Sequence, residues 1–207
     1  MKTVVMMSGG IDSPVTGYLM LSRGYEIVAL HMDNQPFTDE STIWKVKEHV
    51  KKLENLFNTN IKLYITPHGD NQLEFIRNCD RHVGCLLCRR LMWRIAEKVA
   101  IKEGCDFITT GESIGQVASQ TVKNIRVESG VLNTPIIRPL AGMDKMEIIE
   151  IARKIGTYDI SISPGICCKA VPDKPATSAK LEKVLNEEGK VSVELMVETS
   201  LRTTRVE

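Results

Sequence analysis

The chain has 207 residues, 43% hydrophobic and 26% charged, with a formal net charge of +1, which is typical of a folded protein with one substantial core. The near-neutral charge argues against a broad basic surface for binding nucleic acid unaided, and no run approaches the roughly 20 apolar residues of a membrane span. The N-terminus, Met1-Lys2-Thr3, lacks the form of a signal peptide, so we expect a cytoplasmic protein whose six cysteines serve metal binding or thiol chemistry rather than disulfides.

Strand-like apolar runs alternate with helical patterns along most of the chain. The predicted strands are 3–7, 26–32, 61–65, 106–110 and, more weakly, 135–137. The predicted helices are 14–23, 41–57, 89–103 and 145–155. This alternation predicts an α/β fold with a doubly wound parallel sheet, helices on both faces, and ligands at the carboxyl ends of the strands.

Local signals mark where these helices begin and end. Gly24, Gly104 and Gly156 follow helical stretches and are expected as C-caps, and Asp144 with Glu147 resembles a capping box. We expect one main domain over residues 1–178. Residues 179–207 are expected to form one helix, near Leu181 to Leu185, and then a polar tail.

The turn after the first strand carries the strongest signal, Ser8-Gly9-Gly10-Ile11-Asp12-Ser13. Glycines let backbone N–H groups approach a phosphate, and a helix starting with Ser13 as N-cap and Pro14 at N1 would add positive charge there. The Gly-Lys-Ser/Thr ending of a Walker loop is absent, so this is a different kind of phosphate site. Asp12 suits Mg²⁺, which binds carboxylate and phosphate oxygens. The alternative is an ordinary strand-to-helix turn.

The pattern Ser-Gly-Gly-x-Asp-Ser resembles that of the PP-loop ATP pyrophosphatases, which cleave ATP to AMP and pyrophosphate. Members of that superfamily activate a carbonyl oxygen as its adenylate, and a nucleophile then displaces AMP. The motif by itself indicates the superfamily and leaves the substrate open.

A second block, Gly111 to Gln120, follows the fourth predicted strand. Small polar residues there are as compatible with a plain loop as with a pocket floor. This block is similar to the tRNA 4-thiouridine sulfurtransferase family, which also supplies sulfur for thiamine biosynthesis in some bacteria. The similarity extends over roughly residues 3–180 and includes these further segments: Asn133-Thr134-Pro135, Arg138-Pro139-Leu140, Gly142 to Lys145, Ile151 to Thr157, Arg89 to Met92, and Cys167-Cys168 with Pro172 and Pro175.

The resemblance implies a set of ATP-binding residues, with the adenine ring near the end of the second strand. The implied residues are Met6, Met7, Ser8, Gly9, Gly10, Asp12, Ser13, His31, Met32, Arg89, Gly111 and Gln120. Arg89 could fork onto phosphate oxygens, and Gly111 permits close backbone approach. Without the resemblance, His31 would be interpreted as a packed strand-end histidine.

Three cysteines form the second implied site. Cys85 and Cys88 have a spacing that can bind one metal, and Cys168, from a distant loop, could complete the site. The resemblance implies either a [4Fe-4S] cluster on Cys85, Cys88 and Cys168, whose open iron would hold hydrosulfide, or a catalytic persulfide on Cys168. The alternatives are zinc with Cys79 or Cys167 as fourth ligand, a redox disulfide, and buried apolar thiols. Cys105 is expected in the core.

Two departures from the family concern its partners. Family members usually carry an N-terminal THUMP module that grips tRNA, and some carry a C-terminal rhodanese domain with a persulfide cysteine. This sequence starts at the PP-loop strand and has only a short tail after Ser178. We therefore expect tRNA to be bound with help from a THUMP-domain protein, and sulfur to come from a cysteine desulfurase or from sulfide. A homodimer is implied by the family alone.

The resulting hypothesis is an ATP- and Mg²⁺-dependent enzyme that adenylates the C4 oxygen of a tRNA uridine and replaces it with sulfur, with Asp12 and Cys168 as the catalytic residues. One alternative keeps the adenylation but changes the acceptor to a small molecule, such as a thiamine precursor or a modified base. The other is a nucleotide-binding sulfur-carrier subunit of a THUMP-containing partner, without turnover of its own.

Overall fold

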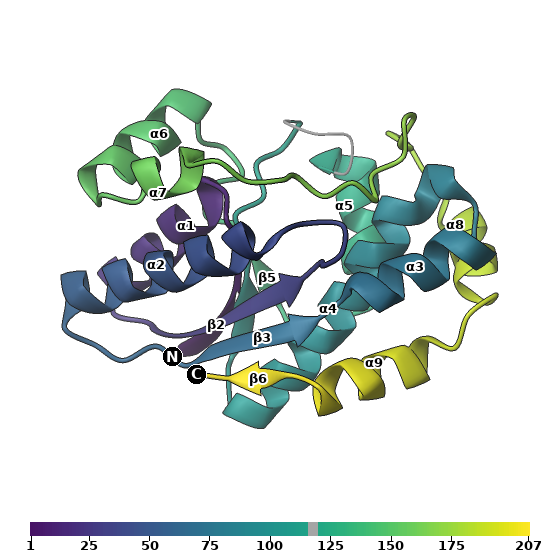
Figure 1. Cartoon of the computed structure of the whole chain (residues 1–207), viewed down its shortest axis with the longest axis horizontal. Coiled ribbons are helices and arrows are strands. Elements are labelled where there is room, and N and C mark those ends of the chain that lie inside the picture. Colours follow the sequence, from purple (N-terminus) through teal and green to yellow (C-terminus); the bar gives the residue numbers. More distant parts are fainter. Residues whose placement is uncertain (116–119) are drawn as a thin grey trace.

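The computed structural model describes residues 1–115 and 120–207, and in them the chain forms one mixed sheet between two layers of helices (Figure 1). Its strands lie in the order β5-β4-β1-β2-β3-β6. All neighbours pair in parallel except β6, which runs antiparallel to β3. The strands are β1 (Lys2–Met7), β2 (Glu26–Asp33), β3 (Leu63–Pro67), β4 (Phe107–Thr109), β5 (Ile136–Ile137) and β6 (Arg205–Val206).

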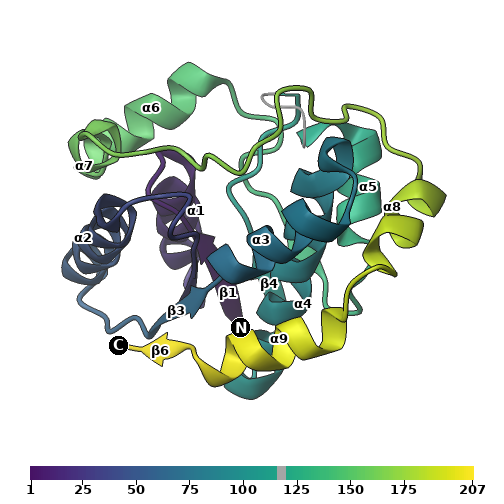
Figure 2. The same ribbon diagram turned by 45° about the vertical axis from the view of Figure 1, so that its right-hand side comes forward.

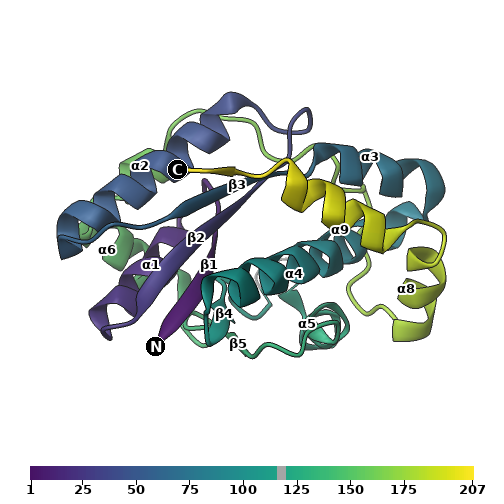
Figure 3. The ribbon, with the colours of Figure 1, turned by 90° about the horizontal axis from the view of Figure 1, so that it is seen from below.

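The central strands are apolar on both faces because helices cover both. In β1, Val5 and Met7 belong to one buried cluster, and Val4 and Met6 to the opposite one. Figure 3 shows α1, α2 and α6 on one side of the sheet and α4, α5 and α9 on the other. The predicted doubly wound α/β fold is confirmed.

The helices, in chain order, are α1 (Asp12–Ser22), α2 (Glu40–Phe57), α3 (Gly69–Asn78), the 3-10 turn η1 (Arg81–Val83), α4 (Gly84–Glu103), α5 (Val122–Ser129), α6 (Lys145–Lys154), α7 (Tyr158–Ile162), α8 (Leu181–Glu188) and α9 (Val193–Arg202). The three predicted C-cap glycines, Gly24, Gly104 and Gly156, all have positive φ. The Asp144–Glu147 capping box is also present.

Two predicted helix starts are wrong. α1 begins at Asp12, its N-cap is Ile11, and no side chain caps it, because the Ser13 hydroxyl folds back onto Ser8 instead. α4 begins at Gly84 rather than Arg89. Cys85 and Cys88 therefore lie at the start of this helix, three residues apart and on one face.

The C-terminal residues differ from the expected tail, because helix α9 and strand β6 follow α8. Val193, Met196 and Val197 of α9 are buried in the same cluster as the inner face of α4. The spacing of these apolar residues is that of a helix. It was not recognised in the sequence because polar residues separate them. β6 then closes the sheet edge beside β3.

A long irregular segment, residues 163–180, runs from α7 to α8 across the carboxyl ends of the strands (Figure 2). We call it the crossing segment. Nζ of the buried Lys45 donates to the carbonyls of Ser161 and Ser163, at 3.1 and 2.6 Å, and holds its start. Further on, the Lys169 N–H donates to the Phe37 carbonyl at 3.0 Å. The crossing segment is therefore tied to α2 and to the loop before α2 on both sides of Cys168.

Among the described helices, none combines the length and the apolar character that crossing a bilayer requires.

Two glycines of α4 provide a test of backbone strain. Gly104 has φ +63° with open space around its missing Cβ, so Gly104→Ala should lower the free energy of unfolding by about 1–2 kcal/mol through strain alone. Gly84 has helical φ −54° and equally open space. Gly84→Ala should stabilise by about 0.4–1 kcal/mol. Urea unfolding measures the free energy of unfolding of both variants. A change of the same sign and size in the two would contradict the prediction.

Candidate functional site

The turn between β1 and α1 is closed by two serine hydroxyls. The Ser8 N–H donates to Ser13 Oγ at 2.9 Å, and Ser13 Oγ donates to the Ser8 carbonyl at 3.0 Å. The Gly10 N–H lies 3.3 Å from Ser8 Oγ. These contacts hold the loop in shape with no help from a ligand, so an incoming anion meets a preorganised turn at a helix N-terminus.

Two glycines are required here by close packing. A Cβ on Gly111 would lie 3.0–3.1 Å from backbone atoms of Asp12 and Ser13. A Cβ on Gly9 would lie 3.2 Å from the Lys45 side chain. Gly111 therefore lets the loop after β4 approach the β1 loop, which brings the two predicted motifs together.

A pocket of about 250 Å³ opens at this point, at the carboxyl ends of β1, β2 and β4. It is lined by nearly every residue that the sequence analysis assigned to ATP. These are Met6, Met7, Ser8, Gly10, Asp12, Ser13, His31, Met32, Arg89, Gly111 and Gln120. Gly9 is in the loop but does not line the pocket, and residues 116–119 of the Gly111 to Gln120 block lie outside the described residues.

His31 forms part of the pocket floor. It is 3% exposed, and its Nδ1 lies 3.0 Å from the Met7 carbonyl. Burial lowers the pKa of His31, although the Met7 contact opposes the shift. The ring is therefore neutral at physiological pH and held in one orientation between β1 and β2.

Asp12 forms an ion pair that the sequence analysis did not foresee. Its Oδ1 is 2.5 Å from Nζ of Lys145, the first residue of α6. Lys145 belongs to the segment Gly142 to Lys145 that carries the family resemblance, but no role was predicted for it. The ammonium group lies where a cation bound to Asp12 would be expected.

A buried charge network surrounds Arg89. Its guanidinium donates to Glu112 and, at 2.6 Å, to Glu128, while Arg138 donates to the other oxygen of Glu112 at 2.8 Å. Burial opposes the charge of Arg89, but Glu112 and Glu128 outweigh it and raise its pKa. Burial raises the pKa of Glu128 to about 7, against the opposing effect of Arg89. The ion pairs with Glu112, Glu128 and Arg138 were not predicted, because these residues are distant in the sequence and only folding brings them together.

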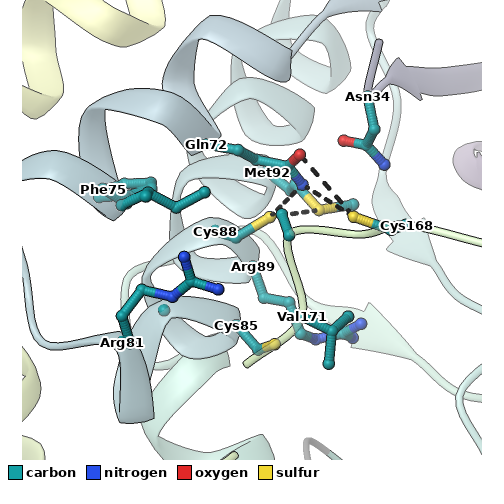
Figure 4. A pocket seen from close by; sticks show the side chains of 13 residues that line it. Asn34, Gln72, Phe75, Arg81, Cys85, Cys88, Arg89, Met92, Cys168 and Val171 are labelled. Carbon is teal, nitrogen blue, oxygen red and sulfur yellow. Dashed lines mark hydrogen bonds between the residues drawn. The ribbon is translucent and has the colours of Figure 1, made fainter. Parts of the chain in front are cut away.

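A second pocket, of about 220 Å³, contains the three cysteines of the predicted sulfur site, Cys85, Cys88 and Cys168 (Figure 4). Gln72 of α3 lies between two of them. Its Nε2 is 3.5 Å from Cys88 Sγ and 3.6 Å from Cys168 Sγ. Cys168 belongs to the crossing segment, so this segment brings the third cysteine to the two that α4 carries.

Cys88 has the most polar surroundings of the three. Besides Gln72, His68 Nε2 lies 3.2 Å from its sulfur, and Asn71 contacts His68 Nδ1. Burial lowers the pKa of His68 to about 4. Burial also raises the pKa of the Cys88 thiol to about 12, with Gln72 opposing. A free Cys88 is thus a neutral thiol, and only a bound cation would favour the thiolate.

The remaining cysteines lie apart from this pocket. Cys79 Sγ donates to the Glu187 carbonyl at 3.3 Å, Cys167 is exposed, and Cys105 is half-buried against the core. Within residues 1–115 and 120–207, no three or more His, Cys, Asp or Glu side chains are arranged to hold a metal ion. The three pocket thiols are therefore gathered but not preformed around one ion.

The two pockets adjoin. Asn34, Arg89 and Met92 line both of them. A group at this junction could be reached from the phosphate loop on one side and from a cysteine sulfur on the other. Such an arrangement suits a two-step reaction in which a carbonyl is first activated by a nucleotide and then attacked by sulfur.

The fold and the serine-glycine loop define the class, which is a PP-loop α/β protein. The chain belongs to the ThiI family, "Thiamine biosynthesis protein (ThiI)", whose profile matches residues 1–193. A probable tRNA sulfurtransferase of Methanosarcina mazei is 42% identical over 99% of this chain and 51% of its own length. One from Alkaliphilus metalliredigens is 43% identical over the whole chain and 53% of its own length.

Among solved structures, a 4-thiouridine synthetase in complex with RNA and ATP superposes with a TM-score of 0.95 at 38% identity. The match covers this entire chain and 54% of that one. The chain thus spans about half the length of the relatives it matches.

The raised pKa of Glu128 predicts a pH effect on stability. A carboxyl whose pKa is higher in the folded state stabilises the fold below its unfolded value of 4.5, and the contribution is lost as pH rises through about 7. Wild-type protein should therefore lose stability between pH 5 and 8, and Glu128→Gln should lose less. Urea midpoints across this range measure it. The exposed Glu150→Gln should keep the wild-type slope, and an unchanged slope in Glu128→Gln would contradict the assignment.

Proposed function

We propose that this chain is the catalytic unit of an ATP-dependent tRNA sulfurtransferase that converts a uridine to 4-thiouridine. The observation that carries the proposal is the junction of the two pockets. The pocket of the PP loop and the pocket of the three thiols share Asn34, Arg89 and Met92 as lining residues. Membership of the ThiI family and the similarity to a 4-thiouridine synthetase with bound ATP support it.

ATP would occupy the pocket at the carboxyl ends of the strands. The adenine ring would lie against His31 and Met32, and the phosphates would be bound by the N–H groups of the Ser8 to Ser13 loop and the N-terminus of α1. Gly111 and Gln120 would close the opposite side. Arg89 would face the phosphates through the part of its guanidinium that its two carboxylate partners leave free.

Asp12 fits a role as the magnesium ligand. It is the acidic side chain of the loop, it lines the pocket, and its carboxylate already attracts the Lys145 ammonium. Mg²⁺ bound with ATP would supply charge neutralisation at the phosphates. Lys145 would then be released from Asp12 toward the phosphate oxygens.

The reaction has two steps. The C4 oxygen of uridine attacks the α-phosphorus, and pyrophosphate leaves. Sulfide then adds to C4, the C4–O bond breaks, and AMP leaves with the former carbonyl oxygen. If the sulfur comes from a persulfide on Cys168, a second thiol must also attack the Cys168 sulfur, which breaks the S–S bond, leaves a disulfide and frees the sulfur on C4. The loop amides would stabilise charge that develops on the α-phosphate in the first step.

Cys85, Cys88 and Cys168 would hold a [4Fe-4S] cluster. Three soft thiol ligands in one pocket fit this group, and the cluster spreads its ligands over several irons, which suits thiols that are gathered without being arranged around one ion. The chemistry it would supply is the activation of sulfide. Zinc on the same residues, or a persulfide on Cys168 alone, remain the rival assignments.

The name of the family suggests a second candidate acceptor. It refers to thiamine biosynthesis, so a thiamine precursor is the alternative acceptor for the same adenylating site. Pyrophosphate release separates the two, because stimulation by tRNA supports the first acceptor and indifference to tRNA supports the second.

Three partners belong to the same proposal. These are tRNA, held in part by a THUMP module in the same or another chain, a sulfur donor such as a cysteine desulfurase or free sulfide, and a second protomer.

Asp12 provides the direct test of ATP chemistry. Asp12→Ala should reduce AMP and 4-thiouridine formation by at least about 100-fold while the fold remains intact, because the metal site at the phosphates is lost. Mass spectrometry of digested tRNA and a pyrophosphate assay measure the two products. Asp173→Asn, at an exposed loop position, should behave as wild type. Retained activity in Asp12→Ala would exclude the assignment.

The cysteines provide a metal test. After anaerobic purification, the wild-type protein should contain iron and acid-labile sulfide, and Cys85→Ser, Cys88→Ser and Cys168→Ser should each lose both. Cys79→Ser and Cys167→Ser should retain them, since these residues lie outside the pocket. Elemental analysis and the visible spectrum are the measurements. Stoichiometric zinc without sulfide would overturn the cluster assignment.

A further inference from the structure

Asn34 is the neutral hydrogen-bonding side chain at the junction of the two pockets. Of the three residues that line both, Met92 is apolar and Arg89 is held by Glu112 and Glu128. Asn34 Oδ1 is buried, and within the described residues no donor reaches it. A buried acceptor without a donor is unfavourable, so a ligand that brings an N–H group to this oxygen would be stabilised.

Apolar side chains line the cysteine pocket beside its three thiols. Its volume of about 220 Å³ equals the share of about seven water molecules, at ~30 Å³ each. Phe75, Ile76, Met92 and Val171 supply apolar surface, and Arg81 lies exposed at the rim. Proteins bind an unstacked nucleotide base in this way, between apolar side chains with a cation near the phosphate.

The sulfur atoms are held next to the same amide. In Figure 4 the Asn34 side chain points from the end of β2 toward Cys168, which Gln72 contacts together with Cys88. A base edge bound at Asn34 would therefore lie between the ATP pocket and Cys168. Both partners of the reaction could reach one carbonyl there.

We infer that a uracil-type base binds at the junction of the two pockets, beside the three cysteines and not in their place, and that Asn34 recognises its reactive edge. A carboxamide presents an acceptor and a donor side by side, and its complement is a ring N–H beside a carbonyl. In uracil these are N3–H and the C4 oxygen, the atom that is activated. The inference rests on the proposed function, which places the acceptor carbonyl at this junction.

Binding of free nucleotides tests the site without turnover. The probes are uridine 5′-monophosphate and its N3-methyl derivative, each titrated in the presence of a non-hydrolysable ATP analogue and followed by saturation-transfer NMR. Methylation removes the N3 donor, so it should weaken binding about tenfold in the wild type. Asn34→Leu should abolish this preference. Asn78→Leu, at an exposed position of α3, should keep it.

Three outcomes would overturn the inference: equal binding of the two nucleotides to the wild type, a preference that persists in Asn34→Leu, or no saturable binding of uridine monophosphate. Unchanged binding of the ATP analogue shows that Asn34→Leu is folded, and Asn34→Ser serves as the second variant if it is not. A protein that prefers uridine monophosphate as expected but never forms AMP or 4-thiouridine would contradict the proposed function and leave the base site standing.

Discussion

The central position of β1 in the sheet is the constraint on which the site depends. β1 pairs in parallel with β2 on one side and with β4 on the other, so the carboxyl ends of all three strands lie at one edge. The Ser8 to Ser13 loop follows β1 there, His31 lies near the end of β2 beside it, and Gly111 follows β4. At such a topological switch point the loops diverge and leave a crevice, which here is the pocket at the carboxyl ends of β1, β2 and β4.

The crossing segment makes the second pocket possible. Cys85 and Cys88 are fixed by α4, but Cys168 reaches them because residues on either side of it are bound to α2 and to the loop before α2. The buried Lys45 packs against Gly9 and also donates to two carbonyls near the start of the crossing segment. The Ser8 to Ser13 loop and the crossing segment are thus held by the same side chain.

Charge burial gives the site its rigidity. Arg89 lies between the two pockets and is neutralised by Glu112 and Glu128, so its position is set before any ligand arrives. Loss of one partner would leave a buried charge uncompensated, which costs far more than a surface ion pair is worth. Burial also lowers the pKa of His31 and His68 and so favours their neutral forms. At the Ser8 to Ser13 loop, in contrast, the ion pair of Asp12 and Lys145 is accessible to solvent.

The sequence by itself determined the parallel α/β sheet, the phosphate loop, the glycine C-caps and the Asp144 capping box, because these depend on short-range patterns of apolar spacing and turn chemistry. Through the resemblance to a family, it also pointed to the three cysteines of one pocket and to most of the loop residues that line the other. Only the tertiary structure decided that Lys145 pairs with Asp12, that Arg89 is held by two carboxylates, that α9 and β6 complete the fold, and that Asn34 lies where the pockets meet. These contacts join residues distant in the chain, and no local pattern encodes which side chains folding brings together.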